Sequence, residues 1–260
     1  MYKEHFAFKK PRNEDIAIWR YMDFTKFVSL LDKAALFFVR SDKLEDAFEG
    51  SYPRKNLDIR KNEFEKVLGE CQIESDPLEI VDVVSQQFKR LRYYIALNCW
   101  NISDQESAAL WKLYLKSNEG IAIRSSFRRL KTSFNSAVDD IYIGTVRYLD
   151  YNSQTIPETN LFYPFLSKRK SFEYEHELRA LLYSQPSMTK NADGKLLMDI
   201  EKPHFENGKY VPVNLKELIH QIYLAPTCSN WLKELVESIV ELYGIEVQVV
   251  RSSLDDSPIY

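Results

Sequence analysis

The sequence predicts an α+β fold: a mixed, mainly antiparallel sheet core with surrounding helices and a helical insertion at about residues 56–93. Strand-like and helix-like segments follow one another without the regular alternation of a doubly wound parallel sheet. No repeat, low-complexity tract or glycine- and serine-rich linker divides the chain. Hydrophobic residues make up 45% of the 260 residues, enough for one core. We therefore expect residues 1–260 to form a single domain.

In the first hundred residues, short apolar runs predict buried strands and amphipathic stretches predict helices. Three strands are predicted, at 16–22, 34–40 and 94–100. Asp23 is placed to cap a helix that begins at Phe24. Two further helices are predicted within the insertion, separated at Asp76-Pro77, because proline suits the first turn of a helix.

The rest of the chain continues the mixture of strands and helices. Ser103 and Glu106 have the spacing of a capping box, which predicts a helix to about Ser117. Strands are predicted at 120–125, 140–151, 174–183, 219–225 and 245–251. Helices are predicted at 127–134, at 161–170 and from Ser229 to Gly244. Residues 184–207 are rich in turn formers and are expected to be a mobile flap.

Charge and composition predict a cytoplasmic protein with no membrane partner. The net charge of −3 gives no overall positive field for tight nonspecific nucleic-acid binding. The first residues lack the apolar core of a signal peptide, and no apolar run approaches the roughly 18 residues of a membrane-spanning helix. Three widely separated cysteines do not resemble a secreted disulfide framework.

The segment 172–182 is the most informative candidate site, because acidic residues alternate along it. Alternate side chains of an extended strand share a face. One face is then expected to carry Glu173, Glu175, Glu177 and Arg179. Two interpretations are open: a solvated face or ion-pair network, or carboxylates at the edge of a cleft. In a cleft, one carboxylate would handle protons while the other keeps its charge.

Arg20 and two aromatic residues are further candidates. Arg20 lies in an apolar strand, and a buried arginine requires an anionic partner, because it keeps its charge. Glu175, Glu177 or a ligand phosphate would each satisfy this need. Trp111 and Tyr114 share the apolar face of a predicted helix, which favours core packing over a stacking wall for a planar ligand.

No metal site is predicted. The acidic cluster Asp42, Glu45, Asp46 and Glu49 lacks the ligand order of a calcium loop, and a solvated turn is the favoured interpretation. The histidines are not paired with cysteines at zinc-ligand spacing. No glycine-rich phosphate loop, dinucleotide-binding glycine triplet or nucleophile elbow occurs, which argues against P-loop ATPases, kinases, Rossmann dehydrogenases and α/β-hydrolases.

Four stretches together resemble a bacterial protein family of unknown function, number 2971. They are Trp19-Arg-Tyr21, Leu36 to Gly50, Trp111-Lys-Leu-Tyr114 with Gly120-Ile-Ala-Ile, and Tyr174-Glu-His-Glu-Leu-Arg179. They cover about residues 16–224, and the last stretch is the most specific. The family usually has Asn-Asp-Pro at a tight turn where this chain has Glu45-Asp46-Ala47.

The layout of this family is similar to that of ADP-ribosyltransferase-like toxins and defence proteins. The resemblance implies that NAD is a substrate and that Glu175 and Glu177 are catalytic, stabilising a developing positive charge. It implies an NAD-binding set of Arg20, Tyr21, Trp111, Tyr114 and Arg179. Within that set, Arg20 would hold the pyrophosphate or ribose, and Tyr114 or Trp111 would stack on nicotinamide.

The leading hypothesis is an NAD-dependent ADP-ribosyltransferase or NAD-cleaving enzyme in bacterial defence or toxin action. Its acceptor, protein or nucleic acid, is left open. The competing hypothesis is a noncatalytic recognition module, in which the same residues form a buried ion-pair lattice and residues 184–207 meet a partner. A metal-dependent nuclease is the third. The enzyme requires Arg20, Tyr114 and Glu177 to converge in an open pocket.

Overall fold

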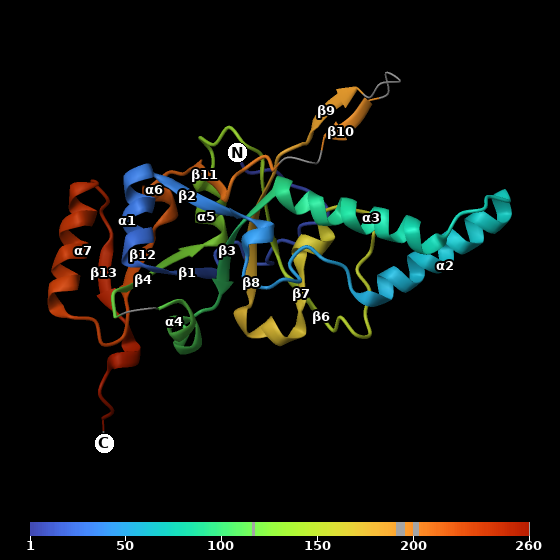
Figure 1. Ribbon diagram of the computed structural model, residues 1–260. Coiled ribbons are helices and arrows are strands. Elements are labelled where there is room, and N and C mark those ends of the chain that lie inside the picture. Colours follow the sequence, from blue (N-terminus) through green and yellow to red (C-terminus); the bar gives the residue numbers. More distant parts are fainter. Residues whose placement is uncertain (116–117, 191–195, 200–202, 260) are drawn as a thin grey trace.

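The computed structural model describes residues 1–115, 118–190, 196–199 and 203–259, and a nine-stranded sheet forms its centre (Figure 1). Its strands are β1 (Ala17–Asp23), β2 (Ala35–Arg40), β3 (Ile95–Ile102), β4 (Gly120–Ser126), β5 (Ile141–Thr145), β8 (Glu177–Tyr183), β11 (Gly208–Pro212), β12 (Gln221–Leu224) and β13 (Gln248–Arg251). Seven of them follow the order β11-β2-β3-β1-β4-β12-β13, and β8 joins β3 to β5. Only the β12–β13 pair of this sheet is parallel, so the predicted mixed, mainly antiparallel α+β fold is confirmed.

The sheet splits along one edge of β3. On its other edge, β3 pairs with β8 over residues 95–101. On the splitting edge, β2 pairs with Ala96 and Leu97, whereas β1 pairs with Asn101 and Ile102. Residues 98–100 therefore have no strand partner there. The Arg20 side chain of β1 donates to Cys99 O instead, and the Asn98 side chain donates to Phe37 O of β2.

Helices cover both faces of the sheet. The main core lies between the sheet and α1 (Phe24–Lys33), α5 (Phe127–Ser133), α6 (Leu215–Leu218) and α7 (Asn230–Leu242). The opposite face of β1 and β4 is covered by α4 (Ala108–Tyr114). The alternation of β1 explains this division, because Ile18 and Met22 join the main core while Trp19 and Tyr21 face α4.

Two pairs of elements extend from the body of the molecule (Figure 1). The helices α2 (Arg54–Cys71) and α3 (Pro77–Leu91) form a long arm, and Asp76 caps α3 through Leu78 N. They occupy the range predicted for the helical insertion. That the insertion belongs to a single domain with the rest of the chain stays a prediction. A second projection is the hairpin of β9 (Ser187–Lys190) and β10 (Leu196–Asp199). The expected flap at 184–207 includes this hairpin, but residues 191–195 and 200–202 lie outside the described residues.

The remaining elements are short. A parallel pair, β6 (Arg147–Leu149) and β7 (Ser167–Arg169), lies beside β8. The 3-10 helices are η1 (Ser41–Lys43), η2 (Arg92–Tyr94), η3 (Tyr163–Leu166), η4 (Lys170–Glu175) and η5 (Ser253–Asp255). Within the described part, no helix is both long enough and apolar enough to cross a membrane.

Several local predictions were wrong. The strand expected at 140–151 is two strands in different sheets, and the helix expected at 161–170 is η3 followed by β7. The capping box is absent: Ser107 caps α4 by accepting from Leu110 N, while the Glu106 carboxylate accepts from Trp111 Nε1. The predicted helix end near Ser117 lies outside the described residues, and α4 ends at Tyr114.

Candidate functional site

The turn before β8 brings Glu175 to the candidate site by a route that strand alternation does not predict. Residues 170–175 form η4, and His176, with a left-handed φ of 39°, ends it and turns the chain into β8. The predicted shared strand face was therefore wrong for Glu173 and Glu175, and Glu173 is exposed. Glu175 is nevertheless buried, because the turn directs its side chain toward the residues of β7.

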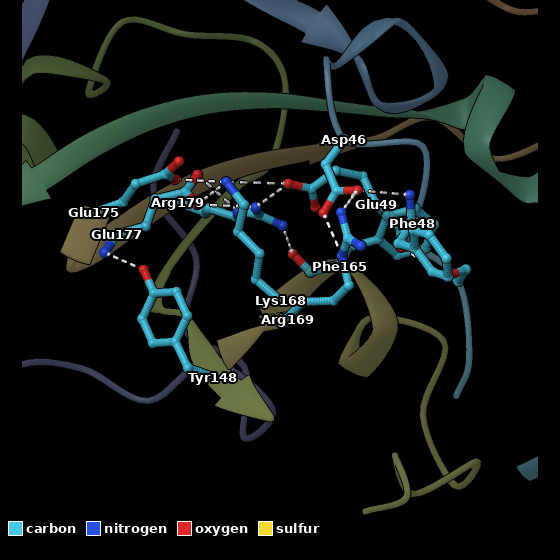
Figure 2. A network of polar contacts seen from close by, with 11 residues as sticks. Asp46, Phe48, Glu49, Tyr148, Phe165, Lys168, Arg169, Glu175, Glu177 and Arg179 are labelled. Atoms are coloured by element: carbon cyan, nitrogen blue, oxygen red, sulfur yellow. Dashed lines mark hydrogen bonds and ion pairs between the residues drawn. The ribbon is translucent and has the colours of Figure 1, made fainter. Parts of the chain in front are cut away.

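Glu177 and Arg179 do lie on one face of β8, and they form a two-pronged ion pair (Figure 2). The Arg179 Nε and Nη2 donate to the two Glu177 oxygens, each at 2.9 Å. Arg179 also donates to Phe165 O at 2.7 Å and to Glu49 Oε1 at 2.7 Å. The exposed fraction is 0% for Arg179 and 5% for Glu177, so this pair is closed to bulk water.

Lys168 of β7 links the three carboxylates of the cluster. Its Nζ lies 2.5 Å from Glu175 Oε2, 3.5 Å from Glu177 Oε2 and 3.5 Å from Glu49 Oε1. We call these five residues, Glu49, Lys168, Glu175, Glu177 and Arg179, the ionic cluster. They come from four separate segments that meet beside β8 (Figure 2).

The ionic cluster holds one more negative than positive charge when all its groups are ionised: three carboxylates face one ammonium and one guanidinium. The surroundings shift the pKa values of Glu175 and Glu177 differently. Burial, only partly offset by Lys168, raises the pKa of Glu175. Burial also acts on Glu177, but the charge and hydrogen bonds of Arg179 prevail and lower its pKa to about 2. Two neighbouring carboxylates thus have pKa values displaced in opposite directions.

Arg20 reaches the split in the sheet beside this cluster. Its Nη1 donates to Cys99 O at 2.6 Å, one of the carbonyls left without a strand partner. Arg20 makes no ion pair within the described part of the chain, so of the three partners considered for it, neither Glu175 nor Glu177 is paired with it. Burial lowers the pKa of the Arg20 guanidinium, and burial followed by the charge of Glu177 raises that of the Cys99 thiol.

Of the three aromatic residues predicted to bind NAD, Tyr114 is exposed, whereas Tyr21 and Trp111 are buried. Tyr114 has an exposed fraction of 47%, yet burial of its hydroxyl, followed by the charges of Cys99 and Glu175, raises its pKa. Tyr114 is thus half exposed, and its hydroxyl is in the electrostatic field of Glu175 and Glu177. Tyr21 and Trp111 lie in the core, with ring centroids 5.0 Å apart, and the Tyr21 hydroxyl accepts from Ser107 N.

Several residues of this site were not predicted from the sequence. Asp46 and Glu49 were expected in a solvated turn, but both are buried, and Arg169 donates to Asp46 Oδ1 at 2.8 Å. The Tyr148 hydroxyl accepts from Glu177 N at 2.7 Å. The one sequence signal for Asp46 and Glu49 was their place in a family-like stretch. Among the described residues, no group of three or more His, Cys, Asp or Glu side chains could hold a metal ion.

These features define an α+β protein with a buried, negatively unbalanced ionic cluster at a split in its sheet. No family model matches the chain, so its resemblance to family 2971 stays a prediction. No curated protein matches it either.

The chain is similar to solved structures of Thermus sp. 2.9 DarT. Thermus sp. 2.9 DarT in complex with NAD+ is 10% identical, with a TM-score of 0.42 over 95% of this chain and 100% of that chain. Its complex with ADP-ribosylated ssDNA is 11% identical, with a TM-score of 0.40 over 95% and 98%. The carba-NAD+ complex is 11% identical, with a TM-score of 0.39 over 94% and 98%. At these values we draw nothing about activity from the likeness.

Proposed function

We propose that the protein cleaves NAD and transfers or releases ADP-ribose, as an ADP-ribosyltransferase or an NAD-cleaving enzyme. The observation that carries the proposal is the ionic cluster, with its excess carboxylate and the opposite pKa displacements of Glu175 and Glu177. A buried negative charge that is not fully compensated is suited to stabilise a cation that forms during a reaction.

The chemistry of NAD matches this charge. Its nicotinamide ring is positively charged, and the bond from the ring nitrogen to ribose breaks with the electron pair leaving on nicotinamide. Positive charge then develops on the ribose, as in other glycosidic cleavages. An acceptor nucleophile or water forms the new bond and loses a proton. A carboxylate beside the ribose would lower the barrier to this step by stabilising the cation.

Glu175 and Glu177 take different roles in this proposal. Glu177 is held by Arg179 and Tyr148 and stays ionised, so we assign it to orienting its neighbours and keeping the site negative. Glu175 has an exposed fraction of 8%, the largest among the three carboxylates of the ionic cluster, and a single cationic partner at 2.5 Å. We assign to it the contact with the ribose.

Arg20 and Tyr114 would hold the substrate. Arg20 is half-buried and uses one Nη1 hydrogen bond on Cys99 O, which leaves donors for a pyrophosphate. The half-exposed Tyr114 ring would stack on nicotinamide, since an accessible aromatic face suits a planar ring. We leave Tyr21 and Trp111 to core packing and Arg179 to the ion pairs.

The test is incubation with NAD and chromatographic measurement of released nicotinamide, with and without protein and single-stranded nucleic-acid acceptors. We expect Glu175→Gln to reduce release at least about 100-fold, because one electrostatic contact to a transition state is commonly worth that much. Glu173→Gln is the matched control: it lies two residues away on the same turn, is exposed, and should stay within about twofold of the native protein. Equal activity of Glu175→Gln and the native protein would rule out the assignment.

The recognition module is the second candidate, favoured by the near-complete burial of Glu177 and Arg179. In that case the ionic cluster is a structural lattice, and no acceptor supports nicotinamide release. Calorimetric titration with NAD separates the two candidates, since the lattice alone offers no site for it. Cytoplasmic location and a role in bacterial defence or toxin action belong to the first proposal.

A further inference from the structure

A hollow of about 560 Å³ lies on the face of the sheet covered by α4, apart from the ionic cluster. Its described lining is Ala108, Trp111, Lys112, Leu115, Asn118, Pro226 and Leu254. Pro226 follows β12 and Leu254 follows β13, so the hollow lies beyond the carboxyl ends of two parallel strands joined through α7. Ligands commonly bind at this end of parallel strands, and the volume is within the usual range of about 300 to 1,000 Å³.

Hydrogen bonds and packing fix the apolar walls. The Trp111 indole donates to Glu106 Oε2 at 2.8 Å, and the same carboxylate accepts from Ser252 Oγ and from Ser253 N. These bonds hold the segment that carries Leu254 against the hollow, although Leu254 has an exposed fraction of 46%. A hydrophobic side chain tied in place beside a cavity is preorganised for an apolar occupant.

The described lining has two polar side chains, one cationic and one neutral. Lys112 is exposed at the rim and forms no ion pair within the described residues, and Asn118 supplies an amide. The remaining lining residues are apolar. An apolar cavity with one unpaired cation at its edge complements a ligand with an apolar body and one negative group.

We propose that this hollow binds a small organic anion whose ring-sized apolar body lies between Trp111 and Leu254 and whose carboxylate, phosphate or sulfonate meets Lys112. The site is separate from the proposed NAD chemistry and holds or fails independently of it. Either a carboxylate or a phosphate can pair with the Lys112 ammonium.

The test uses 8-anilinonaphthalene-1-sulfonate, which has such a body and one sulfonate, and its uncharged counterpart N-phenyl-1-naphthylamine. We expect saturable one-to-one binding of the sulfonate to the full chain, followed by its fluorescence, and about tenfold weaker binding of the uncharged probe. Competition by naphthyl phosphate and by naphthoate then distinguishes the two natural anion classes. Absence of saturable binding, or equal binding of both probes, overturns the proposal.

Two variants with matched controls locate the probe. Ala108→Phe fills the hollow from an exposed position on the first turn of α4 and should weaken binding at least tenfold, whereas Leu113→Phe enlarges an exposed α4 residue outside the lining. Lys112→Met should weaken sulfonate binding about fivefold to tenfold and leave the uncharged probe unchanged, whereas Lys66→Met on the arm should change neither. Unaltered sulfonate binding in Ala108→Phe would show that the probe lies elsewhere.

Discussion

The ionic cluster and the base of the α2–α3 arm both bury an arginine, but they balance its charge differently. At the arm, Arg60 Nε donates to one carboxylate, Glu158 Oε2, at 2.6 Å, and Glu158 keeps partial contact with water. The rings of Tyr52 and Phe88 cover the guanidinium at 4.7 and 4.8 Å. One cation meets one anion here, and Asn56 also donates to Glu158 at 2.8 Å.

At β8, in contrast, three carboxylates share two cations, and the arginine has no exposed surface. Each region has a buried atom without a hydrogen-bond partner, Glu49 Oε2 here and Arg60 Nη2 at the arm, so it is in charge balance that the two regions differ. The Arg60–Glu158 ion pair, in which the carboxylate is partly hydrated, is sufficient to fix the arm to the body. An unbalanced, dehydrated cluster costs folding free energy. The contrast predicts different responses to substitution.

The largest effect is expected from Arg179→Met. The substitution leaves Glu177 and Glu49 buried without their main cation and removes the donor to Phe165 O. Breaking a buried ion pair from one side costs about 3 to 5 kcal/mol of unfolding free energy. Urea denaturation measures this loss of unfolding free energy, with Arg179→Lys as the charge-preserving control. The lysine variant should lose less stability, although lysine cannot form the two parallel hydrogen bonds to Glu177. A loss below about 1 kcal/mol would mean that water already reaches the cluster.

Glu177→Gln should cost roughly 3 kcal/mol at pH 7, because the folded state holds the pKa of Glu177 near 2 against an ordinary value of 4.5. The lowered pKa means that the stabilisation is present above pH 4.5 and is lost as the pH falls toward 2. The native and variant proteins should therefore converge in stability below pH 4.5. Denaturation series between pH 3 and 8 measure this, and a constant difference across the range would contradict it.

Arg60→Met should have a smaller effect, about 1 to 2 kcal/mol. Glu158 stays hydrated and keeps the Asn56 hydrogen bond, so that no charge is left stranded, and methionine retains contact with the flanking rings. Thermal unfolding of this variant beside Arg179→Met gives the comparison directly. If the two losses were equal, burial rather than charge balance would govern both regions.

Local sequence patterns predicted most strands and helices because their causes lie within a few residues. The Asp23 cap and the Asp76-Pro77 helix start are examples: each is confirmed, and each depends on bonds to residues two or three positions away. Strand β11 was not predicted, since its five residues gain their stability from pairing with β2, about 170 positions earlier.

The ionic cluster could be predicted only in part. Glu177 and Arg179 follow the strand period, but Glu175 reaches the cluster through a left-handed residue, His176, that no periodicity indicates. Glu49 lies 130 positions from its partner Arg179, so the sequence alone gives no reason to join them. The same holds for Glu106, whose partners Ser252 and Ser253 replace the expected helix cap.

The smallest change in stability is expected from Glu175→Gln, the variant that should most reduce activity. Burial raises the pKa of Glu175 in the folded state, so its proton stabilises the fold below pH 4.5, and this contribution is lost as the pH rises through the raised value. Glutamine resembles the protonated form, so the variant should equal the native protein in stability at low pH and exceed it at pH 8.

Denaturation of Glu175→Gln and Glu177→Gln in parallel measures this opposition. Stability changes of opposite sign at neutral pH would mean that the two carboxylates, which share Lys168, have different effects. Glu177 would stabilise the fold, and Glu175 would destabilise it. Loss of stability in both would make Glu175 a structural anion like Glu177. The ionic cluster would then differ only in size from the Arg60–Glu158 ion pair at the arm. Its excess negative charge would no longer favour an active site.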